Sequence, residues 1–65
     1  MKTWTRIGKE YLTAKIHLMG IGKYAFMTSL FGKPWESNIN MPNFDTESDA
    51  VAWIEKSGWH ETQKG

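Results

Sequence analysis

Cysteine is absent from this chain of 65 residues, which also has only two prolines and two histidines. The absence of cysteine excludes a disulfide framework and a cysteine-ligated zinc site, two common supports of very small domains. At this length, the burial of apolar surface only just exceeds the conformational entropy that folding costs. We therefore expect the four tryptophans, three phenylalanines and two tyrosines to supply most of the buried surface.

Long apolar runs are also missing. No segment approaches the roughly 20 apolar residues of a membrane-spanning helix, and the basic residues near the start are not followed by the apolar stretch of a secretion signal. We therefore expect a cytoplasmic protein without a membrane partner. A hydrophobic content of 40% and the lack of any low-complexity tract argue against general disorder.

Charge is divided unevenly between the two halves of the chain, although the formal net charge is only +1. Residues 1–33 carry six basic side chains and one acidic side chain, whereas residues 34–65 carry two basic and six acidic ones. Two explanations are open. Either the basic and acidic halves form opposite surfaces that meet different partners, or the two halves attract each other within the fold.

The clearest two-residue periodicity places apolar side chains at alternate positions from 12 to 18, which predicts a β-strand with one apolar face. For the hairpin that follows, we prefer a three-residue loop over residues 20–22 to a two-residue loop, because Gly22 can then take a positive φ. That loop sets Leu18 opposite Tyr24. The predicted buried face consists of Leu12, Ala14, Ile16, Leu18, Tyr24, Phe26 and Leu30.

An earlier strand is predicted over about 2–7, where β-branched and aromatic residues are frequent. If Lys9 and Glu10 form a two-residue loop, Ile7 lies opposite Leu12 and joins the buried side together with the threonines at positions 3 and 5. The other sheet face then stays open. It is expected to hold Trp4, Arg6, Tyr11, Thr13, Lys15, His17 and Met19.

Residues 44–59 show the signals of a helix. Thr46 is a suitable N-cap, and acidic residues follow it in the first turn, where the helix dipole is positive. The apolar stripe of Ala50, Val51 and Ile54 predicts packing on the apolar sheet face. Gly58 suits the left-handed position just after the helix.

Together these patterns predict a single small α+β domain over residues 1–65. We expect a three-stranded antiparallel β-meander with strands at about 2–7, 11–19 and 23–31, and one C-terminal helix at about 47–57 on one sheet face. Residues 32–43 form a connecting flap with a possible short fourth strand, in which Trp35 covers one end of the core. Residues 60–65 are expected to be a frayed tail.

Catalytic and metal-binding motifs are not recognisable. The two histidines, His17 and His60, do not have a metal-ligand spacing, and the acidic residues near Thr46 are explained by the helix start rather than by a calcium loop. We therefore expect no enzymatic activity, no metal and no cofactor.

The open sheet face is the predicted working surface, because it places aromatic rings among cations. Single-stranded nucleic acid is bound by base stacking combined with phosphate neutralisation, and a small antiparallel sheet also fits the major groove of double-stranded DNA. The candidate residues for binding nucleic acid or another partner are Trp4, Arg6, Tyr11, Lys15, His17 and Lys23.

Three predicted strands followed by the segment FDTESDAVAW, residues 44–53, resemble the sheet-to-helix junction of two families of DNA-binding domain: the AP2 type and the arm-binding domains of tyrosine recombinases. Both families contact DNA through the sheet. The resemblance implies Arg6, Lys15 and Lys23 as DNA contacts and implies no catalytic residue. The long connection over residues 32–43 and the low net charge depart from that pattern.

The sequence therefore predicts a small non-enzymatic binding module with nucleic acid as its leading ligand. Two alternatives remain open. The first is a protein-binding modulator or inhibitor of a host enzyme, of the phage or mobile-element type, because an exposed aromatic and methionine-bearing face also suits a protein interface. The second is a homodimer that buries the open face against its own copy.

Overall fold

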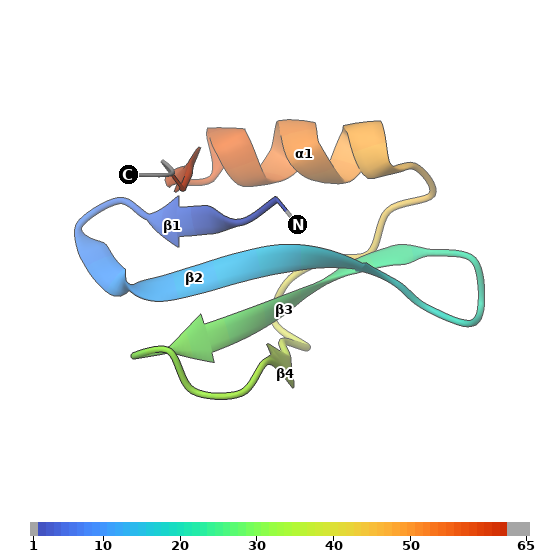
Figure 1. Ribbon diagram of the computed structural model, residues 1–65. Coiled ribbons are helices and arrows are strands. Elements are labelled where there is room, and N and C mark those ends of the chain that lie inside the picture. Colours follow the sequence, from blue (N-terminus) through green and yellow to red (C-terminus); the bar gives the residue numbers. More distant parts are fainter. Residues whose placement is uncertain (1, 63–65) are drawn as a thin grey trace.

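The computed structural model describes residues 2–62, which form one antiparallel sheet and a helix lying across it (Figure 1). The strands are ordered β4-β3-β2-β1-β5 in the sheet. This arrangement confirms the predicted α+β class with a helix on one sheet face. The elements are β1 (Trp4–Arg6), β2 (Lys9–Leu18), β3 (Tyr24–Leu30), β4 (Glu36–Ser37), α1 (Glu47–Lys56) and β5 (Trp59–Glu61).

The β2–β3 hairpin has the predicted register. Leu18 lies opposite Tyr24, and Leu12 lies opposite Leu30. The turn is closed by a hydrogen bond from the Met19 amide to the Lys23 carbonyl (2.8 Å), and Gly22 has the expected positive φ of 82°. Because every side chain on a strand changes face when the register slips by one residue, this hairpin determines which side of the sheet the helix covers.

The predicted register of β1 is wrong. The turn falls at Ile7 and Gly8 instead of at the predicted Lys9 and Glu10. Arg6 therefore lies opposite Lys9, and Trp4 lies opposite Ala14. A bulge between Thr5 and Arg6 accommodates the extra residues of β2. Trp4 and Arg6 therefore face the helix, and the side chain of Ile7 is 60% exposed. This register places the indole of Trp4 in the core, where a large aromatic ring buries on the order of 150–250 Å².

The core lies between α1 and the centre of the sheet. Ala14 and Ala50 have no exposed surface, and their small side chains let the helix come close to β2. The residues of the core cluster are Trp4, Ala14, Phe26, Ala50, Ile54 and Trp59.

The predicted buried face lies toward the helix, but its two ends are exposed. Leu18 and Leu30 keep 55% and 44% of their surface in contact with solvent. A ten-residue helix is about 15 Å long, whereas a ten-residue strand such as β2 extends for about 34 Å. The helix therefore covers only the middle of the hairpin.

The helix begins and ends as predicted to within one residue. The Thr46 hydroxyl accepts a hydrogen bond from the Asp49 amide (3.1 Å), and Gly58 has a φ of 88° just after the C-cap. A side chain outside the helix completes its C-terminus, because the Arg6 guanidinium donates to the Ser57 carbonyl. The helix is thereby joined to β1.

The expected tail is partly a strand. His60 and Glu61 belong to β5, which pairs with β1 so that Trp4 lies opposite Glu61. Residues 63–65 of the expected tail lie outside the described residues. The possible fourth strand is confirmed as β4, which pairs with β3, and residues 38–43 continue as irregular chain to a bridge between Phe44 and Tyr24.

Candidate functional site

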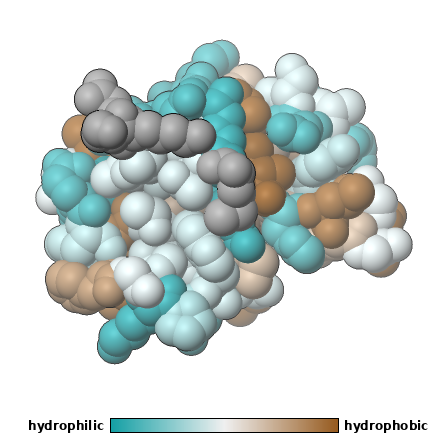
Figure 2. All heavy atoms as spheres, viewed as in Figure 1, coloured by the Kyte–Doolittle hydropathy of each residue, from teal (hydrophilic) through white to brown (hydrophobic). Residues whose placement is uncertain are grey.

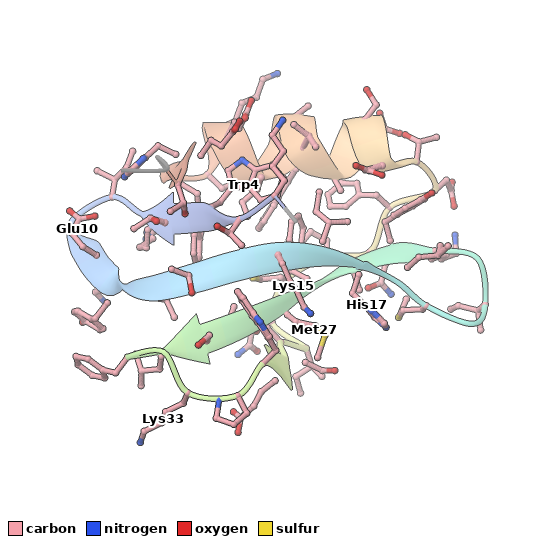
Figure 3. All side chains as sticks on the ribbon, viewed as in Figure 1. Trp4, Glu10, Lys15, His17, Met27 and Lys33 are labelled. Carbon is pink, nitrogen blue, oxygen red and sulfur yellow. The ribbon has the colours of Figure 1, made fainter. Side chains whose placement is uncertain are left out.

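The sheet face that points away from α1 is the candidate binding site, and we call it the open face. Its central positions follow from the β2–β3 register, in which Lys15 lies opposite Met27 and His17 lies opposite Ala25. Figure 3 shows Lys15, His17 and Met27 on one side of the sheet, whereas Trp4 lies between β1 and the helix. The open-face positions of the strands include Thr13, Lys15, His17, Ala25, Met27, Ser29 and Ser37.

Two of the six predicted site residues lie on the helix side of the sheet, and a third is held by an ion pair. Trp4 is 1% exposed beneath the helix. Arg6 donates to the Ser57 carbonyl, and its guanidinium carbon lies 5.8 Å from the centre of the Trp59 ring. Both corrections follow from the shifted β1 register.

Lys23 sits at the base of the β2–β3 turn and pairs with Asp45, which shortly precedes the helix. The hydrogen bond from the Lys23 ammonium, together with its positive charge, lowers the pKa of the Asp45 carboxyl below its usual value. This exposed pair joins the basic half of the sequence to the acidic half, as does the pair of Lys2 with Glu61 (3.3 Å). Part of the charge asymmetry is therefore used within the fold.

Tyr11, Lys15 and His17 are accessible on the side away from the helix, and Tyr11 forms an aromatic pair that the sequence did not predict. Its ring stacks on the ring of Phe31, with centroids 4.6 Å apart and planes inclined by 11°. The two side chains are 43% and 68% exposed. Hydrophobic atoms accordingly reach the surface near the end of β3, at the lower left of Figure 2. Two stacked rings held open to solvent are a ready surface for another planar group.

Phe31 is displayed by an unfavourable backbone conformation. Its φ is 54°, and Gly32 follows with a φ of 72°. The Lys33 amide donates to the Leu30 carbonyl (3.1 Å), so the four residues form a turn with positive φ at both central positions, as in type I′. This turn favours Asn-Gly, and the left-handed region costs an ordinary side chain about 1–2 kcal/mol. A bulky exposed ring in such a position points to a role outside folding.

We expect Phe31→Asn to be more stable than Phe31→Ala by about 1 kcal/mol, because both variants lose the ring but asparagine tolerates the left-handed conformation. Urea unfolding of the two variants measures this difference. Equal midpoints would show that residue 31 has no conformational preference of this kind. Replacing Leu30 with the same two residues provides the control, because Leu30 has no positive φ.

The second aromatic feature of the open face is Trp35. The ammonium nitrogen of Lys15 lies 5.1 Å from the centre of its ring, within the range of a cation–π contact. The Ser29 hydroxyl donates to the Lys33 carbonyl, which joins the chain after the turn to β3. Trp35 was predicted to cover one end of the core. Instead, it lies against Lys15 and remains partly exposed.

The charge of the open face is weakly positive. Lys15 lies near its centre, and Lys33 follows the Phe31 turn with its side chain exposed. Acidic groups lie at both edges of the sheet: Glu36 is exposed in β4, and the Glu10 carboxylate lies 3.8 Å from the His60 ring nitrogen. The face therefore offers two cations beside three aromatic rings.

Other kinds of site find little support in the part of the chain that the structure describes. Within residues 2–62, no three side chains that ligate metals lie together, and no helix is long and apolar enough to span a membrane.

Comparison with known proteins identifies no relative of this chain. The likeness of residues 44–53 to the AP2 and recombinase arm-binding domains stays a prediction. No family model, no curated protein and no solved structure matches this chain.

Proposed function

We propose that this protein binds single-stranded nucleic acid on its open face. The observation that carries the proposal is the exposed aromatic pair of Tyr11 and Phe31, of which Phe31 is held in an unfavourable backbone conformation. A ring that serves only the fold has no need of such a position. Lys15 and Trp35 extend the same surface toward the middle of the sheet.

The chemistry of the face fits a single strand better than a duplex. Unpaired bases expose their planes, and stacking of a base on a protein ring contributes about 1–3 kcal/mol. Reading a duplex groove requires hydrogen-bonding side chains that reach base edges. Arg6 and Lys23, which the resemblance to DNA-binding domains implied as contacts, are engaged with Ser57 and Asp45. Lys15 and Lys33 suit the sparser phosphates of a single strand.

The test is fluorescence anisotropy with labelled single-stranded DNA and RNA of mixed sequence, titrated at 50 mM and 200 mM salt. If two phosphates are neutralised, affinity for a single strand is expected to fall roughly sevenfold between these salt concentrations. Lys15→Gln is expected to weaken binding and to flatten this dependence. Lys56→Gln, on the helix, is the matched control and is expected to change neither.

Tyr11→Ala is the second variant in this experiment, and it is expected to weaken binding roughly tenfold or more because it removes a stacking surface. Its fold is checked by circular dichroism. Binding that is absent at 50 mM salt, or that is weakened equally by Lys15→Gln and Lys56→Gln, would contradict the proposal.

A protein partner is the second candidate, and a specific observation favours it. Ile7, Leu30 and Phe31 are all exposed at the end of the sheet that holds the aromatic pair. A modulator of another enzyme, or a second copy of this chain, would cover these apolar side chains. In that case Ile7→Ser would abolish a salt-insensitive association, and light scattering at high protein concentration would detect a dimer.

A further inference from the structure

A hollow lies on the opposite side of the sheet from the aromatic pair, and the proposed function does not use it. Its lining residues come from the turn end of the β2–β3 hairpin, the start of β1 and the first turn of α1. Its volume is about 300 Å³, at the lower end of the range for small-molecule sites. The residues that line it are Lys2, Trp4, Ile16, Leu18, Tyr24 and Glu47.

The walls of this hollow are mostly apolar. Trp4 and Ile16 belong to the core or pack against it, so these walls are fixed by the fold. Leu18 is different, because it lines the hollow while 55% of its surface is exposed. The helix is too short to cover it. A ligand with an apolar body would remove this leucine from water.

The two charged side chains that line the hollow, Lys2 and Glu47, differ in their ion pairing. The Lys2 ammonium lies 5.8 Å from the centre of the Trp4 ring and 3.3 Å from the Glu61 carboxylate, whose charge balances its own. Glu47 takes part in none of the ion pairs among residues 2–62. Asp49 lies in the same helical turn and adds to the negative potential. The positive end of the helix dipole offsets part of this charge, but two carboxylates leave the first turn negative, so the hollow favours a cation over an anion.

We propose that this hollow binds a small organic cation, namely an ammonium or guanidinium group carried on an aromatic or branched apolar body. The charged end meets the Glu47 carboxylate, and the body lies on the neighbouring side chains of Leu18 and Tyr24. The hydroxyl of Tyr24 offers a further hydrogen-bond acceptor. This site is separate from the open face, so the two ligands do not exclude each other.

The test is a nitrogen-15 NMR titration of the protein with phenethylammonium chloride, with sodium 3-phenylpropionate as the anionic counterpart. We expect saturable shifts at residues 16–18, 24 and 47 with the cation only. Glu47→Gln is expected to weaken binding about tenfold, since it removes a charged hydrogen-bond acceptor. Asp49→Asn is the matched control, because it removes the same charge from the same turn outside the hollow.

A second pair of variants tests the apolar contact. Leu18→Thr is expected to weaken the cation several-fold, whereas Ile21→Thr, an exposed substitution in the same hairpin that does not line the hollow, leaves affinity unchanged. Preference for the anion, no saturable shift, or equal losses in Glu47→Gln and Asp49→Asn would overturn the proposal. Failure of oligonucleotide binding would leave this result unaffected, because it is measured on the other side of the sheet.

Discussion

Replacing Trp4 with alanine is expected to lower the free energy of unfolding by about 3–5 kcal/mol, which is the range for removing a fully buried large aromatic side chain. The ring is 1% exposed and belongs to the cluster that joins the helix to the sheet. Its indole nitrogen also donates to the Glu55 carboxylate (3.3 Å). A domain of this size has only a few kcal/mol of stability. Trp4→Ala is therefore expected to be largely unfolded at room temperature.

The control for this prediction is Trp35→Ala. The same side chain is removed, but from a partly exposed position against Lys15. We expect a loss of about 1 kcal/mol or less, because little buried surface and no cavity are involved. Urea unfolding followed by circular dichroism measures both variants. Similar losses in the two would contradict the placement of Trp4 beneath the helix.

Gly58→Ala is expected to lower the free energy of unfolding by about 2–4 kcal/mol, because it combines two costs. The backbone at position 58 has a φ of 88°, which side chains other than glycine disfavour. A β-carbon there would also lie 2.8 Å from a guanidinium nitrogen of Arg6, the group that donates to the Ser57 carbonyl. The substitution therefore disturbs the helix end and the link to β1 together.

Two further variants separate these costs. Gly20→Ala should be neutral or slightly stabilising, since Gly20 has no positive φ and no atom lies near the position of an added β-carbon. In an Arg6→Ala background, the clash at position 58 disappears, and Gly58→Ala is expected to cost only the backbone term, about 1–2 kcal/mol. A cost that is the same with and without Arg6 would show that the guanidinium does not occupy this place.

The elements that the sequence predicted correctly are those whose signals are local. The hairpin register follows from alternating side chains and from a glycine at the left-handed position of its turn. The helix follows from the capping hydroxyl of Thr46 and from Gly58. Each of these signals lies within a few residues of the structure that it predicts, so no knowledge of the tertiary fold is needed to interpret it.

The errors have a different origin, because they depend on contacts between distant residues. The position of the first turn was decided by the burial of Trp4 under a helix that starts more than 40 residues later. The segment Trp59–Glu61 is short and carries two polar side chains, and it becomes a strand only because β1 offers an unpaired edge. Neither fact can be deduced from the local pattern.

The candidate site was predicted in part for the same reason. Alternation placed Lys15 and His17 on the open face and was right, because the hairpin register is local. Phe31 and Trp35 were missed as members of the site. The dipeptide Phe31-Gly32 carries a weak signal, since glycine at that position is typical of type I′ turns. The contact of Trp35 with Lys15 depends on the path of residues 31–35, for which the sequence has no comparable signal.

The pairing of β1 with β5 has a consequence for how the protein folds during synthesis. β1 completes its hydrogen bonding only when Trp59–Glu61, a segment more than 50 residues later in the chain, has been synthesised. Until then, the nascent chain exposes the indole of Trp4 and one bare edge of β1. Folding of the emerging polypeptide is therefore delayed until β5 has left the ribosome, and the intermediate that precedes this pairing is the species most prone to aggregate.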